Sequence, residues 1–272
     1  MAAETPGLPE LKQRLKAVWM VGDFGKIAPL LQSEADAFIV RLDLQPGMRV
    51  LDVGCGTGNQ SLPAARTGAK VTGVDIAPNL LAQAVARAQE ENADIDFREA
   101  DAEALPFRDG EFDVVLSMFA AMFAPRPEVA VAELLRVCRP GGLIAMANWT
   151  PSGFVGEQNV IMSRYAPPPP PGIVSPMLWG DEDVVRERFG SGVALSATKR
   201  TVTFDIPLGP TETEAYFRQY IGPTQILMKQ LDPERQKALV DEMAAHWALH
   251  NQGDGERTLV HAEYLEVHAW PN

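Results

Sequence analysis

The sequence predicts an α/β fold, in which a doubly wound, mostly parallel sheet has an antiparallel last strand and carries a helical cap. Between Arg49 and Thr150, short apolar runs alternate with amphipathic segments, which is typical of a parallel sheet covered by helices on both faces. A glycine-rich turn follows the first apolar run. Beyond residue 150 the pattern becomes less regular and richer in helical segments, and these supply the cap.

The regular part of the chain predicts strands and helices in alternation. We expect the strands at Arg49–Val53, Lys70–Asp75, Asp94–Arg98, Phe112–Met118 and Leu143–Trp149. We expect the helices at Asn59–Thr67, Asn79–Glu91 and Pro127–Cys138. Gly68 is a typical stop just beyond the first of these helices. Because proline is tolerated only in the first helical turn, Pro63 predicts that this helix begins late or bends.

The flanking segments are predicted mainly as helices. Before the core we expect helices at Leu11–Trp19 and Ile27–Leu42, and the proline run at 167–171 predicts an extended loop. The later elements are expected as a helix at Asp181–Phe189, a strand at Ala197–Ile206, helices at Thr211–Ile221 and Pro233–His250, and a final strand at Leu259–His268. We therefore divide the chain into an N-terminal helical lid segment (1–48), a core (49–150), and a part that completes the sheet (151–272), with cap insertions at about 151–190 and 211–250.

Composition and charge argue against several classes of protein. Of the 272 residues, 36 are acidic and 24 basic, which gives a formal net charge of -12 and a pI of about 4.8. Nucleic-acid-binding proteins usually present a basic face, because phosphate neutralisation supplies much of their affinity, so no nucleic-acid partner is expected. The two cysteines, Cys55 and Cys138, predict no disulfide framework. Without a leader-like N-terminus or an apolar run of about 18 residues, we expect a cytoplasmic protein with no membrane span.

The strongest functional signal is the segment Asp52-Val53-Gly54-Cys55-Gly56-Thr57-Gly58-Asn59. Here an apolar strand carries an acidic residue near its end, and three glycines then turn the chain toward a helix. Glycine permits positive φ angles and lets a ligand touch the backbone, while a helix N-terminus offers unpaired amide donors. The spacing departs from the dinucleotide pattern, which needs glycine where Asn59 stands, and no Gly-Lys-Ser/Thr of a phosphate-binding loop follows.

Further polar positions follow strands at the same expected edge of the sheet. Asp75 ends the second strand, where a carboxylate over the first turn can accept both hydroxyls of a ribose. After the third strand, the Asp101 carboxylate is placed to accept from an exocyclic amine, and the Ala102 amide to reach a ring nitrogen. Ser117, near the end of the fourth strand, is expected to face the same crevice.

With these motifs in this order, the chain resembles class I S-adenosylmethionine-dependent methyltransferases, particularly the ubiquinone/menaquinone-type and related small-molecule enzymes. The resemblance covers about residues 49–149 and implies a Rossmann-like core that binds S-adenosylmethionine and releases S-adenosylhomocysteine. It also likens the segment 19–24 to a lid over the cofactor. The implied cofactor residues are Asp52, Gly54, Gly56 and Gly58 around the methionine moiety, Asp75 at the ribose, Ile76, Leu80, Asp101 and Ala102 around the adenine, and Ser117 near the sulfonium; Asn59 is also expected to contact the cofactor.

The resemblance implies methyl transfer to a small organic acceptor at oxygen, carbon or nitrogen. Such an in-line displacement mainly needs alignment and exclusion of water, and a general base is needed only for a protonated acceptor. The candidate catalytic residues are His246, His250 and Tyr165. Because Glu242, His246 and His250 recur every four residues on one expected helix, they share a face. Three interpretations of this face are open: a general base with a carboxylate that orients it, a metal site, or a solvated polar surface. We favour the solvated surface, so no metal is expected.

Other functions stay open from the sequence. One is methylation of a protein or an RNA, which the acidic charge and the bulky cap argue against. Another is a module that binds S-adenosylmethionine without turnover, because the glycine turn and Asp75 predict binding but not catalysis. A nicotinamide oxidoreductase is disfavoured by Asn59. We therefore expect a small-molecule substrate, and a monomer or homodimer.

Overall fold

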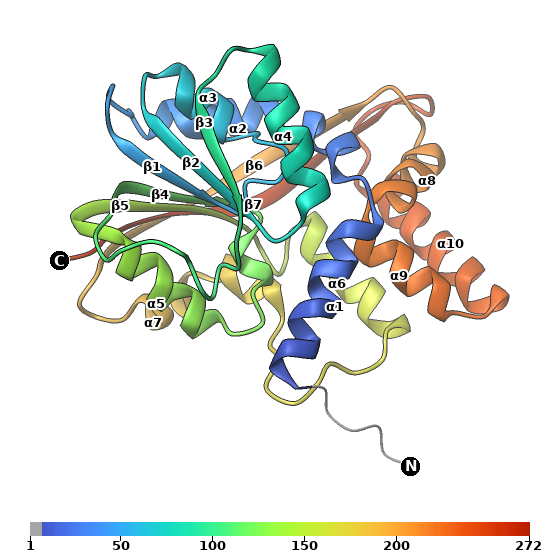
Figure 1. Cartoon of the computed structure of the whole chain (residues 1–272). Helices are drawn as coiled ribbons and strands as arrows, with labels where there is room; N and C mark the ends of the chain where they lie inside the picture. The colour runs from blue at the N-terminus through green and yellow to red at the C-terminus, as the bar shows by residue number, and fades with distance from the viewer. Residues whose placement is uncertain (1–6) are drawn as a thin grey trace.

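The computed structural model describes residues 7–272 as a seven-stranded sheet with helices on both faces and a group of helices at one end (Figure 1). The strand order is β3-β2-β1-β4-β5-β7-β6; β7 is antiparallel to β5 and β6, and the other neighbouring pairs are parallel. The predicted fold class is therefore confirmed. The strands are β1 (Arg49–Val53), β2 (Lys70–Asp75), β3 (Ile95–Glu99), β4 (Phe112–Met118), β5 (Cys138–Trp149), β6 (Ala194–Ile206) and β7 (Thr258–Trp270).

The helices fall into two layers on the sheet and one cap (Figure 1). On one face lie α2 (Gln32–Arg41), α3 (Ser61–Arg66) and α4 (Pro78–Glu90), and on the other lie α5 (Pro127–Val137) and α7 (Glu182–Phe189). The cap contains α1 (Leu8–Val21), α6 (Phe154–Tyr165), α8 (Pro210–Tyr220), α9 (Gly222–Gln230) and α10 (Pro233–His250). The 3₁₀ turns are η1 (Phe24–Lys26), η2 (Ala28–Leu31), η3 (Ala121–Phe123) and η4 (Pro176–Gly180). Among residues 7–272, no helix has the length and apolar character that a membrane crossing needs.

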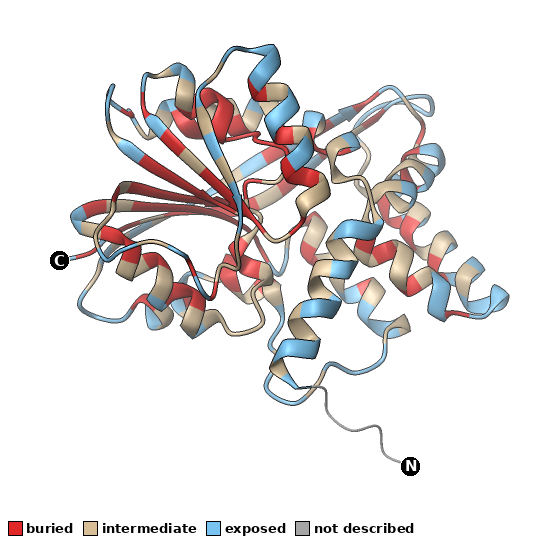
Figure 2. Cartoon of the chain, viewed as in Figure 1, coloured by how far each residue is buried: buried red, intermediate tan, exposed pale blue. Residues whose placement is uncertain are grey.

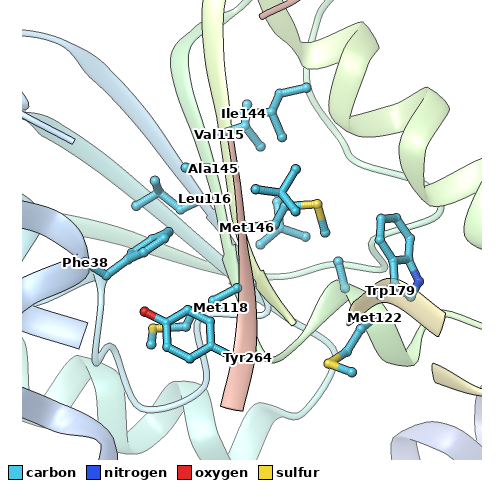
Figure 3. Packing of buried hydrophobic residues seen from close by; sticks show 14 of the residues in the cluster. Phe38, Val115, Leu116, Met118, Met122, Ile144, Ala145, Met146, Trp179 and Tyr264 are labelled. Atoms are coloured by element: carbon cyan, nitrogen blue, oxygen red, sulfur yellow. The ribbon is translucent and has the colours of Figure 1, made fainter. Parts of the chain in front are cut away.

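The main core lies in the middle of the sheet, where helices cover both faces (Figure 2). Central strands of a parallel sheet are buried on both sides, which is why β1 and β4 are apolar runs and not alternating patterns. Figure 3 shows Leu116 of β4 and Met146 of β5 between Phe38 of α2 and Trp179 of η4. The core thus fixes the strand ends at which the polar residues of the predicted site stand.

The cap has a small apolar core of its own. Ile161 of α6, Leu227 of α9, and Leu239 and Met243 of α10 are buried against one another. In addition, α10 packs against both α6 and α8, and α1 packs against α9. The cap is therefore a packed unit that joins the N-terminal helix α1 to α9, about 200 residues later in the chain.

Several elements differ in extent from the prediction. The helix expected at 59–67 begins at Ser61, which places Pro63 in its first turn as proline requires. The single helix expected at 27–42 is the 3₁₀ turn η2 followed by α2, a frequent arrangement at helix N-termini. Strand β5 begins five residues earlier than predicted, because Cys138 pairs with Phe112 ahead of a bulge in the β4 pairing. Helices α6 and α9 were not predicted.

Candidate functional site

The glycine-rich turn after β1 has the backbone that the sequence predicted. Gly54, Gly56 and Gly58 have φ angles of +74°, +53° and +84°, a region in which other residues are strained. At Gly54 there is also no room for a side chain, because a Cβ would lie 2.2 Å from the Cβ of Ala120. The amide of Gly56 donates to the Asp75 carboxylate over 2.8 Å, so the turn is fastened to the end of β2.

Asp75 stands beside this turn at the carboxyl end of β2. Its second oxygen accepts from the amide of Ala77 over 2.9 Å, so backbone donors hold both oxygens. Burial raises the pKa of this carboxyl, although the amide hydrogen bonds act in the opposite direction. Each oxygen keeps a second lone pair, which is the feature needed to accept from a ligand. Ile76 and Leu80 follow it along the same wall.

The polar residues after β3 are joined to the first cap helix. Lys12 of α1 forms ion pairs with both Asp101 and Glu103, the latter over 2.9 Å. The Glu103 side chain is fully buried and is also paired with Arg126 at 2.8 Å. Lys12 therefore ties α1 across this edge of the sheet. Nothing in the local sequence around Lys12 predicts the contact, because it joins positions about 90 residues apart.

These residues surround one cavity of about 300 Å³ at the carboxyl ends of the parallel strands. Part of its wall is the segment likened to a lid: Trp19 and Phe24 line the cavity, and the Trp19 ring packs edge-on against Phe123 with centroids 5.1 Å apart. Of the eleven cofactor residues implied by the sequence, those on the wall are Gly54, Gly56, Asn59, Asp75, Ile76, Leu80, Asp101 and Ala102.

The other three, Asp52, Gly58 and Ser117, lie behind the wall. The expectation that Ser117 faces the crevice is wrong, because its hydroxyl is used inside the protein: it donates to the Val53 carbonyl and accepts from the Ala121 amide, each over 2.9 Å. Ser117 thereby joins β4 to β1 and holds the turn after β4. Ser117 therefore contributes to the cavity by positioning the turn that lines it.

Asp52 is completely buried beneath the glycine turn. One carboxylate oxygen accepts from the Ser61 hydroxyl over 2.6 Å, and the other, Oδ1, has no hydrogen-bond partner within residues 7–272. Burial is the main cause that raises its pKa to about 7, and the nearby Asp75 charge adds to the effect. A buried acceptor without a donor is costly in a fold, so Asp52 is a functional candidate.

The rest of the cavity wall is apolar and aromatic. The Phe119 and Trp149 rings are stacked, with centroids 3.7 Å apart and planes 3° apart. Phe119 has a φ of +56°, a strained angle for an aromatic residue that often marks a functional site. Side chains from the cap and the later strands complete this wall, among them Met162, Met177, Phe204, Phe217, Met243 and Trp247. This half of the cavity suits a small apolar ligand.

One ion pair, which the sequence pattern did not predict, interrupts the apolar wall. Glu214 of α8 lines the cavity, is only 3% exposed, and accepts from the Nε of Arg218 at 2.9 and 3.1 Å. Burial raises its pKa, and Arg218 opposes that rise. The carboxylate accepts no other hydrogen bond from residues 7–272, so it keeps acceptor capacity toward the cavity. In the sequence this pair has the four-residue spacing of an ordinary surface ion pair on a helix.

The three predicted catalytic candidates do not lie on the cavity wall. On α10 the wall residues are Met243 and Trp247, whereas His246 is directed at the carbonyl of Phe154, 3.0 Å from its Nε2. Burial lowers the pKa of His246. Tyr165 donates a hydrogen bond to Glu242 over 2.6 Å. The Glu242 carboxylate, which its four-residue spacing placed with His246 and His250, is therefore bonded to Tyr165. None of the three, His250 included, is placed to act as a base inside the cavity.

Comparisons with known proteins agree with this architecture. A family model described as a methyltransferase domain matches residues 51–146. Two uncharacterized proteins from Mycobacterium tuberculosis are 43% and 37% identical to this chain, over 76% and 97% of its length and 77% and 99% of theirs. A demethylmenaquinone methyltransferase from Renibacterium salmoninarum is 39% identical, over 44% of this chain and 48% of its own.

Among solved structures, a putative methyltransferase from Bacillus halodurans has a TM-score of 0.62 with 20% identity, covering 88% of this chain and all of that one. That likeness supports the fold. The domain match identifies the part of the chain that builds the site, because it spans the glycine turn and the strand ends that line the cavity. The chain therefore belongs to one family with the two mycobacterial proteins, and its residues 51–146 form a methyltransferase domain with the class I, Rossmann-like fold.

Proposed function

We propose that this protein transfers the methyl group of S-adenosylmethionine to a small, largely apolar acceptor by in-line displacement. The observation that carries the proposal is one continuous cavity, whose wall holds the predicted cofactor residues on one side and aromatic and methionine side chains on the other. The cofactor, when bound, supplies a methyl group on a positively charged sulfur, which needs no protein nucleophile.

The residues on the first wall fit this cofactor. A Cβ placed on Gly56 would meet nothing within 4 Å, which leaves open space against the backbone of the turn. The free lone pairs of Asp75 suit the two ribose hydroxyls, and the Asp101 carboxylate and Ala102 amide suit the edge of the adenine. Behind the turn, Asp52 has one unpartnered oxygen, and the positively charged amino group of the methionine moiety would favour the ionised form of this carboxyl.

The protein's own contribution is to align the reactants and exclude water. Proximity and orientation lower the barrier of a two-reactant step by about 7–11 kcal/mol at most, without a side-chain nucleophile. Trp19 and Phe24 cover the cavity from the N-terminal side, and the stacked Phe119 and Trp149 rings offer a flat surface for an acceptor. If the acceptor carries a proton, Glu214 is the residue that we assign to accept it, because it is the buried carboxylate in the apolar half.

An aromatic acceptor with a hydroxyl or amine group fits these walls best. The flat rings favour stacking, and Glu214 provides an acceptor for one polar hydrogen. The demethylmenaquinone methyltransferase relative supports a ring-shaped acceptor by its name. Methylation of an RNA is the weaker alternative, because the net charge of -12 opposes binding of a polyanion.

The test is to incubate the protein with methyl-labelled S-adenosylmethionine and a panel of hydroquinones, phenols and aromatic amines. We expect label in at least one small product. Glu214→Gln should reduce that rate at least ten-fold without changing cofactor affinity, because general acid–base catalysis typically contributes about 10²–10⁴-fold. Glu212→Gln, an exposed residue on the same helix, is the matched control and should leave the rate unchanged. Label found only on protein or RNA would contradict the acceptor class.

A further inference from the structure

Two histidines and a glutamate from neighbouring cap helices meet outside the cavity. His246 and His250 lie one turn apart on α10, and Glu157 projects from α6. The Oε2 of Glu157 is 2.8 Å from the Nε2 of His250 and 3.8 Å from the Nδ1 of His246. The three ligand atoms lie within 4.8 Å of one another, and in the part of the chain from residue 7 onward this is the one such group of three.

The orientation of His246 is the one that a metal ligand needs. Its Nε2 lies 3.0 Å from the carbonyl of Phe154, so the ring N–H donates there and leaves the Nδ1 lone pair on the side of Glu157. Metal-binding histidines commonly donate their other N–H to a backbone carbonyl, which fixes the tautomer and the ring direction. The Phe154 ring also stacks on the imidazole, with centroids 4.6 Å apart, so the ligand is held before any ion arrives.

The spacing and the ligand types point to a particular class of ion. In a tetrahedral zinc site, ligand atoms at about 2.0–2.2 Å from the metal are separated by about 3.3–3.5 Å. The two distances from Glu157, 2.8 and 3.8 Å, lie on either side of that range. Two imidazoles with one carboxylate suit zinc and similar transition metals, whereas magnesium and calcium prefer sites made of oxygen ligands.

We propose that Glu157, His246 and His250 bind one divalent transition-metal ion of the zinc type, with water in the remaining position. The side chains of Glu157 and His250 are 46% and 32% exposed, so solvent reaches the edge of the site, while the Nε2 of His250 is itself buried and has no hydrogen-bond partner within residues 7–272. The same two helices line the cavity with other residues, α6 through Gln158 and Met162 and α10 through Met243 and Trp247. The ion would therefore cross-link two walls of the cavity from outside and act on the rigidity of the cap. This proposal does not depend on the proposed function.

The direct test uses untagged, chelator-treated protein titrated with Zn²⁺ in a calorimeter. We expect one site per chain with a dissociation constant of micromolar or below. At a free Zn²⁺ concentration 100 times that constant, the melting temperature should rise by about 5 °C or more, because ligand binding stabilises the native state by mass action. Mg²⁺ at the same concentration should produce no shift. Absence of saturable one-to-one Zn²⁺ binding below about 100 μM would overturn the proposal.

Variants show whether these residues hold the ion. His250→Ala and Glu157→Gln change partly exposed side chains, and each should weaken Zn²⁺ binding at least ten-fold while S-adenosylmethionine affinity stays the same. His261→Ala removes an exposed histidine of β7 and is the matched control, with no expected effect. Co²⁺ should give the absorption bands of a tetrahedral site in the wild type and lose them in His250→Ala. Equal weakening in His261→Ala, or a Co²⁺ spectrum independent of His250, would contradict the assignment.

Discussion

Replacing Asp75 by alanine should weaken S-adenosylmethionine binding by about 100-fold. The carboxylate is assigned to two ribose hydroxyls, and a hydrogen bond to a charged group contributes about 1.5–3 kcal/mol net. Two such bonds at the lower figure give about 3 kcal/mol, which is about 100-fold in a dissociation constant. The variant also leaves the amides of Gly56 and Ala77 without their acceptor, so the glycine turn loses support at the same time.

The assay is calorimetric titration of wild type and variant at one temperature, after thermal melting has confirmed that the variant is folded. Asp96→Ala is the matched control, because Asp96 is an exposed aspartate on β3 that pairs with Arg98. It should bind the cofactor as the wild type does. Asp75→Asn keeps the shape but only one acceptor oxygen, so an intermediate loss is expected. If Asp75→Ala binds S-adenosylmethionine within two-fold of the wild-type affinity, the assignment of this residue to the ribose is refuted.

Three further substitutions follow from the same geometry. Gly54→Ala should lower the melting temperature and abolish cofactor binding in a titration, because its Cβ would lie 2.2 Å from Ala120 at a φ of +74°. Asp52 has a pKa raised from 3.8 to about 7, so the neutral acid is favoured in the native state; its contribution to stability is present below pH 4 and is lost as the pH rises through 7. At about 1.4 kcal/mol per pKa unit, the free energy of unfolding falls by at most about 4 kcal/mol for this reason. In Asp52→Asn, denaturant melts between pH 5 and 8 should no longer show this fall. Lys12→Met should weaken cofactor binding several-fold and reduce its salt dependence in titrations, because α1 loses its ion pairs with Asp101 and Glu103.

The sheet was predictable because its signals are local. Apolar runs mark β1, β2 and β4, and the glycines after β1 require a backbone that few other residues adopt. The cap was less predictable. Helix α6 lines the cavity on one side and meets α10 on another, which weakens its apolar periodicity. Helix α9 begins with Gly222 and Pro223, which resemble a turn, yet proline is favourable in the first helical turn.

The grouping of Gly54, Gly56, Asp75 and Asp101 on one cavity wall was also predictable, because strand ends at one edge of a parallel sheet converge whatever the cap does. Its other half depends on which face of each cap helix turns inward. The periodicity of α10 groups His246 with Glu242, but the residue that meets the histidines is Glu157, about 90 residues earlier. Glu214 has the spacing of a surface ion pair and was therefore overlooked. The contact of Glu157 with the histidines and the burial of Glu214 both arise from packing between distant segments, which local patterns do not encode.

The most direct test of the central claim is calorimetric titration of the wild-type protein with S-adenosylmethionine and S-adenosylhomocysteine, with NAD as the control. We predict one-to-one binding of the first two with micromolar dissociation constants, and no heat of binding with NAD. Binding of NAD, or no binding of either sulfur compound, would contradict the assignment of the glycine turn, Asp75 and Asp101 to this cofactor.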